Sequence, residues 1–444
     1  MRTLKFWWTS VWSSEMIKIT ASIIIKTKEK ENITVVVSAV TKITNRLIEI
    51  CDLLIAWKFD EAVTIYNEIK EKHLNIYNEI LNNKENHYYN KLINELKNLE
   101  DIIKWIWILK NLNEQIKAKI LYYGEVLSSI LVAFAINEQW IKSNNYLSKN
   151  LLICEWSYLN SECNFKESKE TLNEWIKNID LDEEIPVITW FWWWDKEWNS
   201  YLFDRWWSDY VASLIWRFLK ADAIEIWTDV DWIMSADPRI VENPILWEEL
   251  DYWVCAEFAL VWAKVLHPKT ISPAQEKFIP VYIKNTFNPE FPWTKICRKI
   301  DTWIKWVNID TNQVLLNFID PTMIGWYWYV FQAVKILNDE KISLDALATT
   351  ETSFSISIKS KFFDKRLREK FLNINDNFKV EIYENITKVS IVWDTIDDFD
   401  VLSKIKESIF MITSWAYWKS LTFFVNNNDS NELLKEIHKN IFWK

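Results

Sequence analysis

The segment KFWWTSVW, residues 5–12, places a lysine before two adjacent tryptophans and a threonine-serine pair. Turns between a strand-like run and a helix-like run normally use glycine, which permits positive φ and a close approach of the backbone. With glycine at positions 7 and 8, the segment becomes a lysine, a Gly-Gly turn and the start of a helix. Converging N–H groups, a helix N-terminus and an ammonium group all favour phosphate. The segment therefore predicts a phosphate-binding loop.

The composition indicates why tryptophan stands in this loop. The chain has 31 Trp and 2 Gly in 444 residues, although glycine makes up about 7% of an average protein. The tryptophans cluster where glycine is expected, as in TWFWWWDKEWNS at 189–200. We infer a genetic code in which UGA means glycine, so that most of these tryptophans are glycines in the native protein and Trp227 is a true tryptophan. Literal indoles at 7 and 8 would fill the phosphate space and disfavour positive φ.

Charge and cysteine usage exclude several classes of protein. The net charge of −10 disfavours a nucleic-acid binder, because no basic surplus is present to neutralise phosphates. The 5 cysteines are scattered without C-x-x-C spacing, which indicates a reducing cytoplasm and no metal site. We find no run of eighteen uncharged apolar residues and so expect no membrane span. Small-molecule chemistry in the cytoplasm is the remaining expectation.

The first two thirds of the chain alternate between two patterns. Continuous β-branched runs, typical of parallel strands buried on both faces, occur at 31–40, 185–191, 221–231 and 279–286. Residues 58–150 have apolar side chains at three-to-four spacing, which predicts amphipathic helices. The alternation predicts an open α/β sheet, whose ligands bind at the carboxyl ends of the strands.

The pattern changes near residue 300 to shorter strand–helix units, such as VNIDTNQVLLNFI at 307–319 and SLTFFVNN at 420–427. Two β-helix-β units of similar length favour small α+β modules. We predict a catalytic domain at 1–298, with a mostly helical substrate-side region at 58–150, and two modules at 299–384 and 385–444.

A second loop, DRWWSDY at 204–210, repeats the paired tryptophans before a helical pattern. With glycine at 206 and 207, this turn would hold Arg205 and Ser208 toward a ligand. The guanidinium of an arginine offers two parallel N–H donors to a carboxylate. The loop therefore predicts a carboxylate-binding site.

Six motifs, taken in order, resemble the signatures of the aspartokinases of the amino-acid kinase superfamily, and the resemblance covers essentially the whole chain. They are KFWWTSV (5–11), VVVSAVTKITNRLIE (35–49), YYGEVLSS (122–129), DRWWSDY (204–210), EIWTDVDWIMSADPR (225–239) and VWAKVLHPKTISPA (261–274). Asp204, Lys42 and the LSKN segment at 147–150 depart from the family's usual pattern. These departures put details of the loops in doubt.

The resemblance implies an amino-acid kinase fold, which is an open, mainly parallel sheet between helices, followed by tandem ferredoxin-like ACT modules. It implies ATP- and Mg²⁺-dependent phosphorylation of the β-carboxylate of L-aspartate, giving 4-phospho-L-aspartate for the synthesis of lysine, threonine and methionine. It also implies inhibition by lysine or threonine, and a homodimer or larger homo-oligomer formed through the ACT modules. Because the attacking carboxylate is already ionised, positioning and charge neutralisation would carry the catalysis.

The same resemblance assigns roles by motif position. ATP would be bound by Lys5, Trp7, Trp8, Ser10, Thr228, Asp229, Met234, Arg239 and Lys264. Aspartate would be bound by Thr44, Glu125, Arg205, Trp206, Trp207 and Ser208, with Glu125 on its amino group and Arg205 on its α-carboxylate. The catalytic residues would be Lys5, Arg205 and Lys264. The effector site would comprise Met323, Asp345, Thr349, Thr350 and Glu351.

Simpler alternatives stay open for some of these residues and for the function. Asp229 and Asp237 also suit turn or cap positions, and the five effector residues also suit ordinary strands and turns. A kinase for glutamate or another acyl acceptor is a second function. A non-catalytic amino-acid sensor is a third, favoured if the tryptophans are literal, and a tryptophan-rich sugar-binding or interfacial protein is a fourth.

Overall fold

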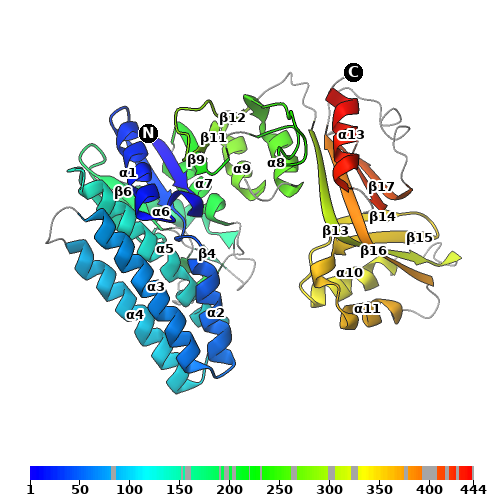
Figure 1. Ribbon diagram of the computed structural model, residues 1–444, viewed down its shortest axis with the longest axis horizontal. Coiled ribbons are helices and arrows are strands. Elements are labelled where there is room, and N and C mark those ends of the chain that lie inside the picture. Colours follow the sequence, from blue (N-terminus) through cyan, green and yellow to red (C-terminus); the bar gives the residue numbers. More distant parts are fainter. Residues whose placement is uncertain are drawn as a thin grey trace. The chain divides into compact units, whose positions relative to one another are not determined.

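The chain folds into two compact units, which are described separately (Figure 1). The first comprises residues 1–233 and 248–300, and the second comprises 234–247 and 301–444. The computed structural model describes residues 1–442 except 82–86, 152–153, 156–161, 190–191, 195–199, 203–206, 220, 231–232, 262–267, 299–305, 322–328, 375–378, 393–407, 416–419 and 427–429.

An eight-stranded sheet forms the centre of the N-terminal unit, in the order β10-β12-β11-β9-β1-β2-β6-β3. Its strands are β1 (Arg2–Phe6), β2 (Ile33–Val37), β3 (Ser143–Tyr146), β6 (Ile185–Ile188), β9 (Ala223–Thr228), β10 (Glu249–Asp251), β11 (Val281–Asn285) and β12 (Thr294–Cys297). Neighbouring strands are parallel except β11 and β12. β2, β6 and β9 are buried at every residue, as their continuous apolar runs predicted. Two short hairpins, β4–β5 (Cys154–Glu155 and Glu162–Cys163) and β7–β8 (Trp192–Trp194 and Ser200–Leu202), lie outside this sheet.

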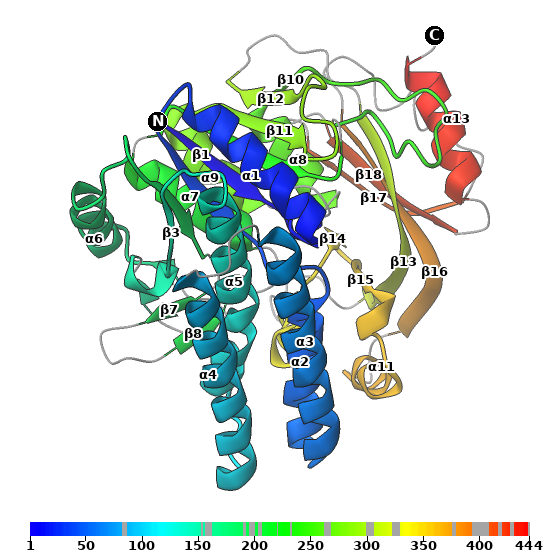
Figure 2. The same cartoon turned by 60° about the vertical axis from the view of Figure 1, so that its left-hand side comes forward.

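Helices pack around the sheet in two groups. They are α1 (Ser14–Lys28), α2 (Ile43–Ile55), α3 (Phe59–Ile80), α4 (His87–Leu109), α5 (Glu114–Asn137), α6 (Phe165–Lys177), α7 (Trp207–Leu219), α8 (Tyr252–Val261) and α9 (Pro268–Lys277). α5 lies on β2, β3 and β6 and packs against α1, α2, α3 and α4, whereas α7 lies on β1 between α6 and α9. Figure 2 shows α2 to α5 extending together as one bundle.

Helix α5 is the centre of that bundle. By length and composition alone it could cross a membrane, but 94% of its most apolar stretch is buried inside the unit. Other helices and strands of the same unit therefore cover its apolar surface.

Two helix ends carry tryptophan in the left-handed region. Trp57, after α2, has φ 60°, and Trp140, after α5, has φ 64°. At the first of these, Trp57 N–H donates to the Leu54 carbonyl and Lys58 N–H donates to the Leu53 carbonyl, which is the Schellman pattern. Glycine usually occupies this position, so the backbone at both tryptophans is the kind that favours glycine.

The C-terminal unit is built on one antiparallel sheet in the order β14-β15-β13-β16-β18-β17. The strands are β13 (Trp306–Ile319), β14 (Ala346–Thr349), β15 (Ser353–Lys359), β16 (Lys379–Val392), β17 (Ile409–Trp415) and β18 (Ser420–Asn426), and the helices are α10 (Tyr329–Asp339), α11 (Lys365–Leu372) and α13 (Ser430–Phe442). The predicted α+β composition therefore appears as a single sheet with helices packed on it.

β13 and β16 run through two hydrophobic cores. The second half of β13 joins β15, α10 and α11 in one core. Its first half contributes Val307 to a different core, with β16, β18 and α13. Ala236 and Val241 belong to this second core, although the sequence placed them in the catalytic domain at 1–298. The predicted modules at 299–384 and 385–444 thus share strands rather than following one another as closed units.

Candidate functional site

The loop after β1 is joined to the end of β9 by hydrogen bonds. Trp7 N–H donates to the Trp227 carbonyl over 3.0 Å. The chain then forms a short 3-10 helix, Trp8–Ser10. The Ser10 hydroxyl lies 3.4 Å from the Trp227 carbonyl and 2.6 Å from the Thr286 hydroxyl. The loops after β1, β9 and β11 therefore meet at the carboxyl edge of the sheet, where ligands of such folds bind.

Lys5 and Trp7 face each other in this loop. The Lys5 side chain is buried, and its Nζ lies 4.3 Å from the centre of the Trp7 ring. The Trp7 indole N–H is buried without an acceptor. Trp7 has φ −76°, so the positive φ expected in this loop is absent here. The lysine predicted to bind phosphate therefore meets an indole where glycine was predicted.

A second loop, after β2, closes against the first. Ser38 N–H donates to the Phe6 carbonyl over 3.1 Å, and the Thr41 hydroxyl donates to the Trp8 carbonyl over 3.0 Å. Lys42 then adopts φ 67° just before α2, which explains why a flexible residue suits this position better than lysine. The half-buried Thr44 follows in the first turn of α2.

Glu125 lies where α5 meets this second loop. Its side chain is buried, and one carboxylate oxygen, Oε2, has no hydrogen-bond partner. Burial raises the pKa of Glu125 to about 8, and the backbone N–H groups of Glu125 and Ala39 oppose that rise. A Cβ on Gly124 would lie 2.9 Å from the Ala39 Cβ and 3.7 Å from the Thr44 hydroxyl oxygen. Thr44 thus lies beside Gly124, the residue before Glu125 in α5, and the unpaired Glu125 oxygen would suit a cation.

Thr228 and Asp229 stand at the end of β9, next to the Lys5 loop. Thr228 is buried and its carbonyl accepts from Thr286 N–H over 2.9 Å. The Thr228 hydroxyl donates to Asp229 Oδ1 over 3.0 Å. Asp229 itself is exposed. Both residues are therefore at the predicted edge of the sheet.

Met234 and Arg239 belong to the C-terminal unit, so the fold of the N-terminal unit does not bring them to Lys5. Arg239 Nη2 pairs with Asp237 over 2.5 Å, which raises the pKa of Arg239. Arg239 N–H also donates to Asp237 Oδ1. Asp237 therefore has the turn role that was the simpler alternative.

Several predicted residues cannot be placed. Arg205, Trp206, Lys264 and Met323 lie outside the described residues. Trp207 and Ser208 are the first two residues of α7, and their roles stay predictions.

The other predicted effector residues lie along one hairpin. Asp345 precedes β14 and is 3.8 Å from Lys359 Nζ. Thr349 ends β14. Thr350 N–H donates to the Ser353 carbonyl over 2.7 Å, which closes the turn that contains Glu351. A turn role thus accounts for Thr350 without an effector.

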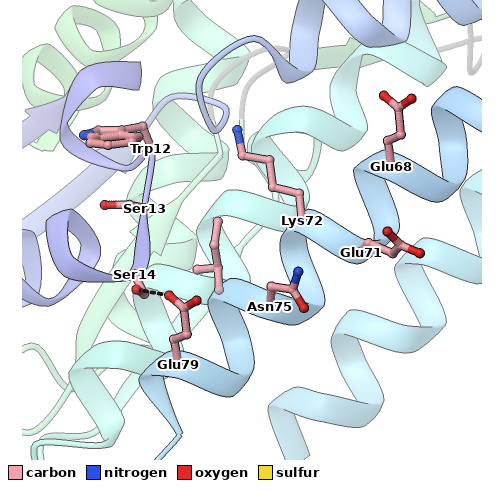
Figure 3. Close-up of a pocket in the computed structure, with 9 residues that line it drawn as sticks. Trp12, Ser13, Ser14, Glu68, Glu71, Lys72, Asn75 and Glu79 are labelled. Carbon is pink, nitrogen blue, oxygen red and sulfur yellow. Dashed lines mark hydrogen bonds between the residues drawn. The ribbon is translucent and has the colours of Figure 1, made fainter.

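A cavity of about 380 Å³ opens between α1 and α3. Its lining is Trp12, Ser13, Ser14, Glu68, Glu71, Lys72, Asn75, Ile76 and Glu79 (Figure 3). Three carboxylates outnumber the single ammonium of Lys72, which disfavours an anionic phosphate. None of the predicted site residues lines it. Among the described residues, no group of three His, Cys, Asp or Glu side chains is placed to hold a metal ion.

One charged cluster around Glu225 was not predicted from the sequence. Glu225 is buried in β9, and its Oε1 pairs with Arg2 and with Lys284, each over 2.6 Å. The indole N–H of Trp227 donates to Glu225 Oε2 over 3.0 Å. A glutamate inside the apolar run ADAIEIW was the available signal, since a charge in a buried strand requires partners.

Comparison with known proteins shows the family to which this chain belongs. The family model described as the amino acid kinase family matches residues 9–285. The chain belongs to the amino acid kinase family. The kinase is similar to aspartokinase 1, chloroplastic, of Arabidopsis thaliana, with 26% identity over 99% of this chain and 80% of that protein. It is also similar to the bifunctional aspartokinase/homoserine dehydrogenase of Buchnera aphidicola, with 27% identity over 100% of this chain but 57% of that protein.

Solved structures confirm the fold class of the kinase. The crystal structure of E. coli aspartokinase III in complex with aspartate and ADP has a TM-score of 0.83, with 21% identity over the whole of both chains. Its similarity extends across both units, so the predicted amino-acid kinase fold with a C-terminal α+β region is confirmed.

Proposed function

We propose that this kinase transfers the γ-phosphoryl group of ATP to the β-carboxylate of L-aspartate. The observation that carries the proposal is Glu125, a buried carboxylate with an unpaired oxygen beside Thr44 and the two loops. An amino acid's ammonium group would supply the missing partner, since a buried unpaired carboxylate is costly. The aspartokinase relatives along the whole chain support aspartate over other amino acids.

The proposed chemistry needs little proton transfer. The β-carboxylate attacks as the anion, while Arg205 and Ser208 hold the α-carboxylate and Glu125 holds the ammonium group. Lys5, Lys264 and the N–H groups of residues 8 and 9 neutralise the phosphates, since the N–H groups of residues 7 and 10 already donate to the Trp227 and Trp7 carbonyls. Mg²⁺ bound together with ATP would neutralise further phosphate charge.

The fit of ATP depends on residue 7. With tryptophan there, the indole lies against the Lys5 ammonium and takes the space that a phosphate would need. With glycine, the indole would be gone, and the N–H groups of residues 8 and 9 could face an anion beside the ammonium. The phosphate site is therefore complete only in the glycine form of the chain.

Structural features support the recoding of tryptophan to glycine. Trp57 and Trp140 occupy left-handed positions at helix ends. The buried indole N–H groups of Trp7, Trp175 and Trp216 have no acceptor, and each such loss costs about 1–3 kcal/mol. Trp227 differs, since its N–H is bonded to Glu225. Mass spectrometry of peptides from the native protein tests the recoding directly, and tryptophan at position 57, 140 or 216 would contradict it there.

Regulation and assembly belong to the same proposal. Lysine or threonine would inhibit the kinase by binding near Asp345, Thr349, Thr350 and Glu351, and two or more copies would assemble through the C-terminal units. E. coli aspartokinase III has been solved in complex with lysine and aspartate, which supports an amino-acid effector. We place the enzyme in the cytoplasm.

The decisive experiment is an aspartate phosphorylation assay with hydroxylamine trapping of the acyl phosphate. Protein carrying glycine at every tryptophan position except 227 is compared with the literal sequence. Activity in the glycine form alone, suppressed by lysine or threonine, would support the kinase and the recoding together. A folded glycine form that phosphorylates glutamate would favour the second acceptor. A folded form that is inactive on both would favour an amino-acid sensor.

A further inference from the structure

The side chain of Trp227 makes a stacking contact, a hydrogen bond and a cation–π contact. It is buried and stacks on Phe6 with ring centres 5.8 Å apart and planes at 14°. Its indole N–H donates to Glu225 Oε2 over 3.0 Å. Lys284 Nζ lies 5.1 Å from the centre of the indole ring. The ring is therefore fixed on one side by stacking and at its edge by a hydrogen bond.

Glu225 is itself fixed by charge. Its other oxygen, Oε1, pairs with Arg2 and with Lys284, each over 2.6 Å. These partners come from β1 and β11, the two strands that flank β9. A buried carboxylate with ion pairs to both neighbouring strands has little freedom, because any movement would break a charge-assisted bond. Glu225 thus ties the indole to three adjacent strands.

The backbone of Trp227 faces the phosphate loop. Its carbonyl accepts from Trp7 N–H over 3.0 Å and lies 3.4 Å from the Ser10 hydroxyl. The next residue, Thr228, stands at the predicted nucleotide edge. A shift of the Trp227 carbonyl would therefore move both the N–H of residue 7 and the Ser10 hydroxyl.

We propose that Trp227 and Glu225 are positioning residues for the nucleotide loop, which they hold in register with β9 through the Trp227 carbonyl. Neither side chain needs to touch ATP. The indole N–H is required for this role, which explains why residue 227 is a true tryptophan. Several other tryptophans in the chain have buried indole N–H groups without an acceptor.

The test substitutes Trp227→Phe, which keeps the stacked ring and removes the N–H donor. Tyr252→Phe is the matched control, because the buried Tyr252 hydroxyl donates to the Ile279 carbonyl over 2.6 Å without contacting the loop. Both substitutions remove one buried donor from an aromatic ring of the N-terminal unit. Each is made in whichever form of the chain, glycine or tryptophan, peptide sequencing shows to be native.

We expect Trp227→Phe to raise the KM for ATP about tenfold, which is the ratio that about 1.4 kcal/mol produces, with kcat changed less than about twofold. Tyr252→Phe should leave the KM for ATP unchanged. Its melting temperature should fall by about as much as that of Trp227→Phe. Glu225→Gln should raise the KM for ATP in the same direction. An equal effect of Trp227→Phe and Tyr252→Phe on KM, or no effect of either, would overturn the proposal.

The activity readout rests on the proposed kinase function, and a second measurement does not. Calorimetric titration with ADP reports the same loop without turnover. If the parent protein binds ADP but phosphorylates no amino acid, the proposed function fails, while a weaker affinity of Trp227→Phe for ADP still supports the positioning role. Unchanged ADP affinity in that variant contradicts it.

Discussion

Replacement of Trp140 by glycine should stabilise the literal chain, although it removes a large aromatic side chain. Trp140 follows α5 with φ 64° and is 88% exposed, so little buried surface is lost. A left-handed conformation costs an L-residue about 1–2 kcal/mol, and glycine adopts it without that cost. The greater freedom of glycine in the unfolded chain offsets part of the gain. We expect a net increase of about 1 kcal/mol in the free energy of unfolding.

The matched control is Trp105→Gly. Trp105 is also exposed, at 59%, but it lies inside α4, where glycine should lower stability by about 0.5–1 kcal/mol. Urea unfolding is followed by far-UV circular dichroism, since tryptophan fluorescence changes with the substitution itself. The two variants should shift the midpoint in opposite directions. Destabilisation of both by similar amounts would show that the left-handed backbone at Trp140 carries no such strain.

Three further predictions concern the candidate site and its supporting helices. Burial raises the pKa of Glu125 from 4.5 to about 8, so the ligand-free protein should lose stability as pH rises between these values. Aspartate affinity should improve over the same pH range, because the ionised carboxylate binds the ammonium group. Glu125→Gln should abolish both trends, measured as unfolding at different pH values and as the KM for aspartate. Gly124→Ala would place a Cβ 2.9 Å from that of Ala39, so the free energy of unfolding measured in urea should fall by about 1–3 kcal/mol. Unchanged stability would mean that the loop after β2 can shift to accommodate the new Cβ. His73 is buried with its pKa lowered to about 4, so stability should fall as pH drops from 6.5 toward 4, and a His73→Leu variant whose acid unfolding is unchanged would disprove this.

Four of the eight strands of the N-terminal sheet could be predicted, because a run of β-branched residues marks each of them in the sequence. β2, β6, β9 and β11 all fall inside the β-branched runs, since burial on both faces favours apolar residues. The charged cluster around Glu225 was harder to foresee. Its signal is a single residue, and its partners Arg2 and Lys284 lie on strands that only the folded sheet brings alongside.

One passage of the chain between the two units could not be predicted from the sequence, for a physical reason. The motif at 225–239 is continuous in sequence, yet the fold divides it between the two units after Ile233. Likewise, the pairing of 306–310 with 388–392 joins segments about eighty residues apart, which no local pattern specifies. Of the candidate site, Lys5, Ser10 and Thr228 lie at or after the ends of β1 and β9, because parallel strands share their carboxyl ends. Thr44 and Glu125 lie on α2 and α5 instead.

The shared strands of the C-terminal unit limit which fragments of the protein can fold alone. A fragment beginning at residue 385 would lose β13 and so expose the main-chain edge of β16, and exposed edges promote aggregation. It would also lack Val307, Ala236 and Val241, which help to close its core. A regulatory fragment able to fold by itself would therefore have to unite residues 234–247 with 301–444, through an artificial linker that replaces the intervening stretch of the other unit.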